Sequence, residues 1–206
     1  IMVMPESMSV ERRKLLAALG AELVLTDKSL GMKGSLEKAD QLAREIPGSI
    51  IAGQFENPAN PQAHYETTAP EIWRDTDGKL DVFVSAFGTG GTVTGVGRYL
   101  KEKDPSVRIV GVEPAASPLV TEGKAAPHKI QGIGANFVPD VLDVDIMDEI
   151  ITVTDDDALD TMKELARTEG LLTGVSSGAA LYAAGQVAAR EENTGKRIAV
   201  SYTHLR

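Results

Sequence analysis

The sequence contains no cysteine, only three histidines, and no apolar run near the roughly eighteen residues of a membrane-spanning helix. Without cysteine, disulfides and cysteine-ligated metal sites are excluded. His64, His128 and His204 are scattered, without the spacing of a metal site. The first residues also lack a signal-peptide pattern. We therefore expect a cytoplasmic protein that binds no metal and crosses no membrane.

Acidic residues outnumber basic ones, 30 to 21, which gives a net charge of -9. A field of that sign repels a polyanion, so the charge argues against nucleic acid as a partner. Hydrophobic residues make up 42% and charged residues 25% of the chain, as in ordinary globular proteins. The 206 residues suffice for one large domain or two small ones.

Short apolar runs rich in β-branched residues alternate with segments of helical periodicity. This alternation predicts an α/β fold, with a parallel sheet covered by helices. Strands are predicted at the end of 1–5 and over 22–26, 50–55, 80–86, 108–113, 150–153 and 197–201. Helices are predicted from a cap at Ser7 or Ser9 to Gly20, over 35–45, over 66–74 with a break near Pro70, over 92–103, from a Thr154–Asp157 capping box to about 168, and over 177–192.

Two segments interrupt this alternation. The two prolines of Asn57–Pro61 remove backbone donors and fix φ, so we predict that this segment continues neither a strand nor a helix. We place a domain junction there. Residues 114–149 show no clear periodicity, and a stretch of that length is usually functional or poorly ordered.

The segment Ala86–Thr92, between a predicted strand and a predicted helix, is the best candidate for a binding site. Its three glycines and two threonines expose backbone N–H groups at the positive end of a helix dipole. Glycines also allow a phosphate to approach the backbone closely. The segment therefore predicts an anion site, and the alternative is a plain tight turn.

The kind of phosphate is not fixed by this segment alone. A P-loop is excluded because no lysine follows Gly91. A dinucleotide fingerprint needs glycine where Val93 stands, but Glu113 lies about twenty residues on, where a ribose-binding acid is found. The alternative for Glu113 is a solvent-exposed carboxylate at a strand end. A nicotinamide-dependent oxidoreductase therefore stays open at this point.

The glycine-rich segment resembles the phosphate loop of the fold-type II pyridoxal-phosphate (PLP) enzymes. Four further segments resemble the cysteine synthases (O-acetylserine sulfhydrylases) of the cysteine synthase/cystathionine beta-synthase family. They are Pro5–Lys14, Gln54–Pro61, Pro127–Gly134 and Gly174–Ala180. They occur in the family's order, and the resemblance extends from Ile1 to about Val200.

The resemblance implies a tryptophan synthase beta-like fold with two open-sheet α/β/α domains. Residues 1–57 would belong to an incomplete smaller N-terminal domain, and 58–200 would form the larger domain that binds the PLP phosphate. The residues implied to hold that phosphate are Gly88, Thr89, Gly90, Gly91 and Thr92. Ser176 would hydrogen-bond the pyridine nitrogen, while the alternative for Ser176 and its neighbour Ser177 is helix capping.

Other roles are implied for substrate and partner binding. Gln54 and Gly132 would contact the substrate, although Gln54 could be an ordinary polar residue that closes a strand. His128 and Lys129 would help to dock the C-terminal tail of serine acetyltransferase, and the alternative is a solvated loop. The family's covalent lysine would lie upstream of Ile1, so we name no catalytic residue and expect an N-terminally truncated, inactive fragment. Residues 201–206 depart from the family and suggest a foreign tail.

The implied reaction of the parent protein is a PLP-dependent β-replacement that forms L-cysteine from O-acetylserine and sulfide, in a homodimer. Alternatives within the family use O-phosphoserine or serine, as in cystathionine beta-synthase. Two further alternatives are the NAD(P)-binding oxidoreductase above and a non-catalytic module that binds serine acetyltransferase.

Overall fold

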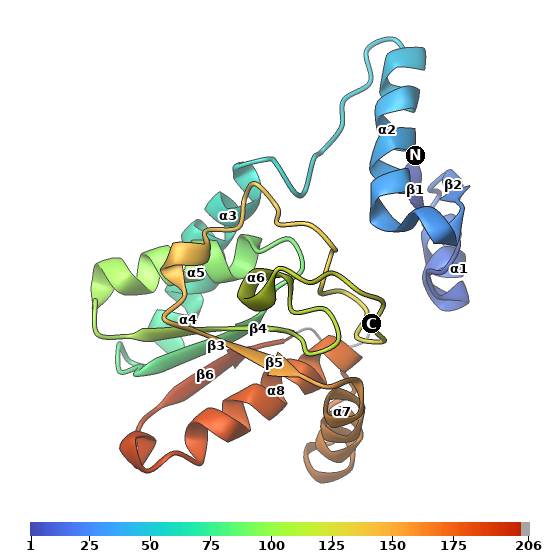
Figure 1. Ribbon diagram of the computed structural model, residues 1–206. Coiled ribbons are helices and arrows are strands. Elements are labelled where there is room, and N and C mark those ends of the chain that lie inside the picture. Colours follow the sequence, from blue (N-terminus) through green and yellow to red (C-terminus); the bar gives the residue numbers. More distant parts are fainter. Residues whose placement is uncertain (203–206) are drawn as a thin grey trace. The chain divides into compact units, whose positions relative to one another are not determined.

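The computed structural model describes residues 1–202 and divides the chain into two compact units, Ile1–Gly53 and Gln54–Arg206. Both units are built from helices and parallel strands, so the predicted α/β fold is confirmed (Figure 1). Residues 203–206, which include His204 and most of the suspected tail, lie outside the described residues.

The smaller unit pairs two short parallel strands. Its elements are β1 (Met2–Pro5), α1 (Val10–Ala18), β2 (Leu23–Thr26), a 3-10 turn (Lys28–Leu30) and α2 (Gly31–Glu45). Ser9 caps α1, because its hydroxyl accepts the N–H of Arg12 at 3.3 Å. Gly20 follows the helix with a φ of 87°. The predicted cap and end of this helix are confirmed, while α2 begins at Gly31 and not at Ser35.

The predicted strand over residues 50–55 is wrong. Residues 50–53 are irregular, residues 54–56 form a turn, and the Ile50 side chain is 92% exposed. A strand needs a neighbour for its backbone hydrogen bonds. The two sheets of the described chain, β1-β2 and β5-β4-β3-β6, do not extend to this run. The β-branched residues indicated a strand, but no ladder is built beside them.

The prediction that Asn57–Pro61 cannot enter a helix is also wrong. A continuous helical segment runs through α3 (Ala59–Ala63), a π-helical turn (His64–Thr68) and α4 (Ala69–Asp75). Pro61 is tolerated because it lies in the first turn, where backbone N–H groups have no intrahelical acceptor. Pro70 stands at the start of α4, where the π turn meets it. The helix predicted from residue 66 therefore begins at Ala59 and is not broken at Pro70.

The larger unit is organised around four parallel strands in the order β5-β4-β3-β6. Their bounds are β3 (Val82–Ala86), β4 (Arg108–Pro114), β5 (Glu149–Val153) and β6 (Ile198–Ser201). The helices of this unit are α5 (Gly91–Lys103), α6 (Leu119–Glu122), α7 (Asp155–Glu169) and α8 (Val175–Ala188), with 3-10 turns at Val144–Ile146 and Glu191–Asn193. Most strands and helices predicted for this region are observed within two residues of the predicted ends.

Side chains of β3 alternate between two apolar cores. Val82 and Val84 pack in the core that contains α8, and Phe83 packs in the core that contains α5. Successive side chains of a strand point to opposite faces, so α5 and α8 cover opposite faces of the sheet (Figure 1). α7 lies against α8.

Two helix ends differ from prediction in detail. The Thr154 hydroxyl accepts the N–H of Asp157 at 3.1 Å, so the capping residue of α7 is confirmed. The Asp157 carboxylate, however, accepts from the same hydroxyl at 2.6 Å and not from the Thr154 N–H, so the box is incomplete. α8 ends at Ala188, before the predicted 192. The Asn193 amide donates to the Val187 carbonyl at 2.7 Å and so caps the last turn.

Candidate functional site

The glycine-rich loop lies at the carboxyl end of β3, where the chain enters α5. Gly90 precedes the helix with a φ of 85°, a conformation that glycine adopts without steric cost. β4 lies on one side of β3 and β6 on the other, and α5 and α8 cover opposite faces. In open α/β sheets, ligands bind outside the carboxyl ends of the strands at such a switch point.

Several N–H groups of this loop have no acceptor within residues 1–202. They belong to Gly88, Thr89, Gly90 and Thr92. The Gly91 N–H is the exception, since it donates to Thr89 Oγ1 at 3.2 Å. Unpaired donors at a helix start, together with the helix dipole, form a site that an anion can complete. The loop therefore has the chemistry to hold a phosphate.

Three of these residues, Gly88, Thr89 and Thr92, border a cavity of about 260 Å³. The cavity is lined by the end of β3, the loop, Gly132, Ile133, Ser176, Ser177, Ser201 and Tyr202. Ser176 is the second residue of α8 and is half-buried, and its hydroxyl has no partner among the described residues. Gly174 occupies the capping position, without a side-chain cap bond. Neither Ser176 nor Ser177 is therefore the N-cap residue of α8.

Gly132 brings a second loop onto the first. A Cβ atom at Gly88 would lie 2.2 Å from the Gly132 carbonyl oxygen, so the two backbones are in direct contact. Gly132 has a φ of 99°, and a Cβ atom there would lie 3.6 Å from Ser176 Oγ. The structure thus brings together the phosphate-loop candidates, Gly132 and Ser176.

Gln54 stands apart from this group. It is the first residue of the larger unit, its side chain is exposed, and it does not line the cavity. Its backbone carbonyl accepts from Asn60 Nδ2 at 2.7 Å. The prediction that Gln54 contacts a substrate stays a prediction, and the alternative that it closes a strand is wrong because no strand is there.

His128 and Lys129 lie in the loop that leads to Gly132. His128 is half-buried, its Nε2 lies 3.1 Å from the Gly134 carbonyl oxygen, and its buried Nδ1 has no partner within residues 1–202. The Lys129 N–H donates to Asp155 Oδ1 at 3.0 Å, while the Lys129 residue is exposed. A freely solvated loop is therefore wrong for His128, which holds its own loop. The partner role of both residues stays a prediction.

Glu113 has a structural role that weakens the dinucleotide alternative. The residue is only 2% exposed, so the alternative of a solvated carboxylate is wrong. Its carboxylate accepts the N–H of Val120 at 3.0 Å and the N–H and hydroxyl of Thr121 at 3.1 and 2.5 Å. These bonds satisfy the start of α6. A carboxylate engaged in this way is not free to bind a ribose.

Sequence reasoning missed two residues that support the loop, Asn60 and His64. Asn60 Nδ2 donates to Thr89 Oγ1 at 3.1 Å, and His64 Nε2 lies 3.2 Å from Thr92 Oγ1. His64 Nδ1 lies 2.9 Å from Thr68 Oγ1, and burial lowers the pKa of its imidazole. The available signal was the shared spacing of four residues, between Asn60 and His64 and between Gly91 and Gly95 on the facing helix.

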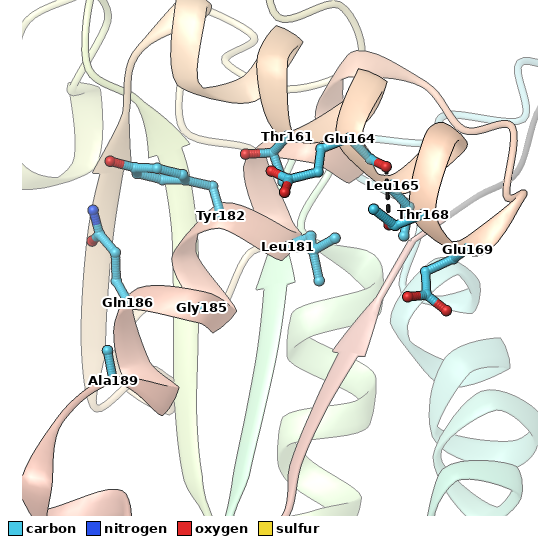
Figure 2. A pocket seen from close by; sticks show the side chains of 10 residues that line it. All are labelled: Thr161, Glu164, Leu165, Thr168, Glu169, Leu181, Tyr182, Gly185, Gln186 and Ala189. Atoms are coloured by element: carbon cyan, nitrogen blue, oxygen red, sulfur yellow. Dashed lines mark hydrogen bonds between the residues drawn. The ribbon is translucent and has the colours of Figure 1, made fainter.

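A larger hollow of about 630 Å³ lies between α7 and α8 (Figure 2). Its walls are mainly apolar and include Leu165, Leu181 and Tyr182, and Thr168 turns its hydroxyl back to the Glu164 carbonyl at 3.0 Å. It contains none of the residues predicted for the site.

Within residues 1–202, no helix is long and apolar enough to traverse a membrane.

Comparisons with known proteins agree with this geometry. Cysteine synthase B of Campylobacter jejuni is 55% identical over 188 residues, which cover 91% of this chain and 62% of the relative. The crystal structure of cysteine synthase from Entamoeba histolytica superposes with a TM-score of 0.90 at 46% identity, covering 98% of this chain and 60% of that one. An O-acetylserine-dependent cystathionine beta-synthase from Helicobacter pylori has a TM-score of 0.90 at 40% identity, covering 98% and 65%.

The chain thus spans less than two thirds of the length of these relatives. The family model described as pyridoxal-phosphate dependent enzyme matches residues 1–203. The resemblance noted in the sequence is confirmed, and so is the fold that it implied, since these neighbours share the α/β arrangement closely. The chain therefore belongs to the family of pyridoxal-phosphate dependent enzymes.

Proposed function

We propose that this chain carries the cofactor-phosphate side of a PLP-dependent β-replacement enzyme, which forms L-cysteine from O-acetylserine and sulfide. The observation that carries the proposal is the set of unpaired N–H groups at Gly88, Thr89, Gly90 and Thr92, with the unpaired Ser176 hydroxyl in the lining of the cavity that Gly88, Thr89 and Thr92 border. Phosphate and pyridine nitrogen are the two polar ends of PLP. The donors at Gly88–Thr92 fit the first, and a neutral hydroxyl fits the second.

The chain's own residues would bind and orient the cofactor. Gly88, Thr89, Gly90 and Thr92 would donate to the phosphate through their backbone N–H groups, and Gly91 would allow the close approach. Ser176 would donate its hydroxyl to the ring nitrogen without protonating it. Bound PLP supplies an electron sink for the substrate's Cα–H bond, and a neutral ring nitrogen weakens that sink to a level suited to β-elimination. No residue of this chain is assigned the covalent or proton-transfer step.

Substrate and partner contacts are a further part of the proposal. Gly132 lines the cavity beside Gly88 and would border the substrate. Gln54, an exposed residue outside the lining of that cavity, would contact the substrate carboxylate. Lys129 is exposed and follows His128, whose ring contacts the Gly134 carbonyl of the same loop. The Lys129 side chain would contribute to docking a serine acetyltransferase tail. The complete protein would be a cytoplasmic homodimer. In a pull-down with a serine acetyltransferase C-terminal peptide, loss of peptide binding in Lys129→Ala would support the docking role. Unchanged peptide binding in both Lys129→Ala and His128→Ala would refute it.

The test of the reaction uses the complete protein that contains these residues. Cysteine formation is measured with O-acetylserine and sulfide, before and after the cofactor is removed by dialysis. The proposal predicts activity that is lost with PLP and restored by it. Activity that NAD(P)H restores instead, or no cysteine at any PLP concentration, would contradict it.

A second candidate is cystathionine formation, because a structural neighbour is an O-acetylserine-dependent cystathionine beta-synthase. The two reactions differ in the nucleophile. Replacing sulfide with homocysteine in the same assay, and O-acetylserine with O-phosphoserine or serine, separates them. A higher kcat/KM with homocysteine than with sulfide would favour the second candidate.

A further inference from the structure

Asn60 and His64, which contact the glycine-rich loop, come from one helical segment that packs closely on α5. A Cβ atom at Gly91 would lie 1.9 Å from Asn60 Oδ1, and one at Gly95 would lie 2.1 Å from the Pro61 carbonyl oxygen. Gly91 and Gly95 are one helical turn apart, so both lie on the same face of α5 and leave that face without side chains at these two positions. This face lets the segment with Asn60 approach the backbone of α5 and reach the loop.

The Asn60 amide has both of its donors engaged. Nδ2 donates to the Gln54 carbonyl at 2.7 Å and to Thr89 Oγ1 at 3.1 Å. The Gln54 carbonyl can only accept, so it requires the amide nitrogen on that side. The orientation of the amide is therefore fixed by chemistry, and the same amide joins the first residue of the larger unit to the phosphate loop.

The consequence concerns the proton of the Thr89 hydroxyl. Thr89 Oγ1 accepts from Asn60 Nδ2 and from the Gly91 N–H at 3.2 Å. A hydroxyl oxygen has two lone pairs, and these two bonds occupy both. The hydroxyl can then act only as a donor, and its hydrogen has no acceptor among residues 1–202. Thr89 lines the cavity, so that donor is available to a ligand there.

We propose that Asn60 is a positioning residue that commits the Thr89 hydroxyl to donate to the phosphate of the ligand. In its absence the hydroxyl would be free to rotate and to accept from water. Through the Gln54 carbonyl, the same amide fixes the start of the larger unit relative to the phosphate loop. This inference rests on the proposed function, because it needs a phosphate-bearing ligand in the cavity.

The test compares binding of PLP and of pyridoxal, which lacks the phosphate, to the complete protein by calorimetry. The readout is the Kd for pyridoxal divided by the Kd for PLP, because a general structural effect would weaken the binding of both ligands and leave this ratio unchanged. Asn60→Ala should weaken PLP binding about 10-fold and leave pyridoxal binding unchanged, as for loss of one hydrogen bond to a charged group. Asn60→Asp, which keeps the shape against Gly91, should lose more, because a carboxylate replaces both donors and repels the phosphate.

Thr89→Val supplies the second arm. It should lower the same ratio, and adding Asn60→Ala to it should cause little further change, because both substitutions remove one interaction. The matched control is Asn193→Ala, since Asn193 is a buried amide that donates to Val187 in another part of the larger unit. It should lower Tm and leave the ratio unchanged.

The outcomes separate the two proposals. If the wild-type protein binds PLP no more tightly than pyridoxal, the proposed function fails and this inference fails with it. If the wild-type preference is present but Asn60→Ala and Asn60→Asp leave it unchanged, or weaken both ligands equally, only the role of Asn60 is overturned. Additive effects of Asn60→Ala and Thr89→Val would also overturn it.

Discussion

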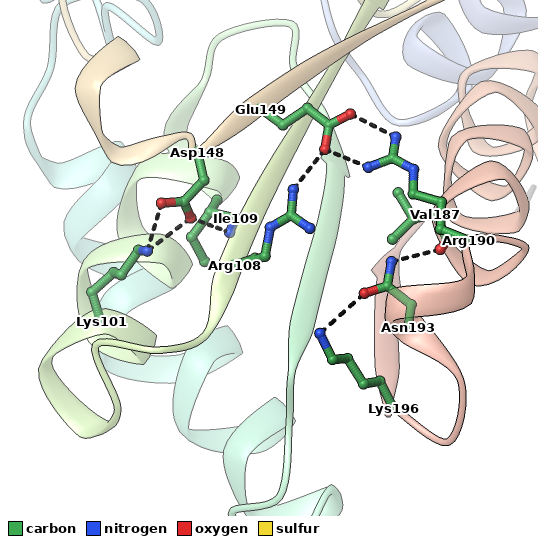
Figure 3. Close-up of polar contacts among 9 residues, drawn as sticks. All are labelled: Lys101, Arg108, Ile109, Asp148, Glu149, Val187, Arg190, Asn193 and Lys196. Atoms are coloured by element: carbon green, nitrogen blue, oxygen red, sulfur yellow. Dashed lines mark hydrogen bonds and ion pairs between the residues drawn. The ribbon is translucent and has the colours of Figure 1, made fainter.

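The two ends of the four-stranded sheet use their polar groups in opposite ways. At the amino end, Glu149 binds Arg108 at 2.9 Å and Arg190 at 2.6 Å, and Asp148 binds Lys101 at 2.7 Å and the Ile109 N–H at 2.7 Å (Figure 3). We call these six residues the amino-end cluster. At the carboxyl end, the N–H groups of Gly88, Thr89, Gly90 and Thr92 and the Ser176 hydroxyl have no partner within residues 1–202.

This difference indicates a division of labour. The amino-end cluster satisfies its own charges, so its contribution is to stability. The carboxyl end leaves donors unpaired around a cavity, and under the proposed function these donors contribute to ligand binding at some expense of stability. Substitutions at one end should therefore affect unfolding, and substitutions at the other should affect binding.

The largest effect is expected for Gly91→Ala, which should lower both the stability of the protein and its affinity for PLP. The new Cβ would lie 1.9 Å from Asn60 Oδ1, so the segment must move away from α5. We expect a loss of about 3 kcal/mol in the free energy of unfolding, together with loss of PLP binding. The matched control is Gly185→Ala in α8, where a Cβ meets nothing within 4 Å. There, urea unfolding should show a gain of up to about 1 kcal/mol.

A smaller effect, confined to stability, is expected for Glu149→Ala. It leaves two partly buried guanidinium groups without a shared carboxylate and should cost about 1–2 kcal/mol after solvent screening. PLP affinity should not change. A loss of affinity comparable to that of a loop variant would show that the two ends are coupled.

The same carboxylate predicts a pH dependence. The hydrogen bond from Arg190 and the charges of both arginines lower the pKa of Glu149 below its usual 4.5. A lowered pKa means that the stabilisation is complete above that value and is lost as the pH falls below it. Wild-type protein should therefore lose stability more steeply below pH 4.5 than Glu149→Ala does. Parallel curves for the two proteins would contradict this account.

Ser176→Ala, at the carboxyl end of the sheet, should affect PLP binding and leave stability almost unchanged. The Ser176 hydroxyl does not cap the helix and has no partner among the described residues. The free energy of unfolding should therefore change by less than about 0.5 kcal/mol. Affinity for PLP should fall about 5-fold, through loss of a neutral hydrogen bond to the ring. Equal losses for PLP and for inorganic phosphate would show that Ser176 acts elsewhere than on the ring.

The smallest effect concerns His64. Burial lowers its pKa from 6.5, so the unfolded chain binds the proton more readily than the folded one. The stability linked to His64 is therefore complete above pH 6.5 and declines as the pH falls below it. Between pH 7.5 and 5.5, His64→Gln should lose slightly less stability than the wild type. A larger loss in the variant would mean that the imidazolium is stabilised in the fold.

The sequence predicted the parts of the fold that are coded locally. The apolar run of β3, the cap at Ser9 and the glycines before α5 are local signals, and each was observed. The run at 50–55 was misread because strand formation depends on a neighbour that no local pattern specifies. Pro61 was misread because a proline that breaks a helix interior is harmless in its first turn.

The candidate site was predictable only in its ligand-facing part. Gly88–Thr92 and Ser176 could be named from motifs, and Gly88, Thr89, Thr92 and Ser176 line one cavity. Asn60 and His64 could not, because their roles depend on how closely their helical segment approaches α5. Glu113 was misread for a related reason. The N–H groups that it binds belong to α6, a short helix with too few residues to show periodicity.

The most direct test of the central claim is an amide NMR spectrum of the complete protein, with and without PLP. The account predicts that the amide protons of Gly88, Thr89 and Gly90 shift downfield and become protected from exchange, while that of Ile109, bound to Asp148, does not move. Unchanged loop amides, or shifts centred on the amino-end cluster, would contradict the claim that the carboxyl end of the sheet holds the phosphate.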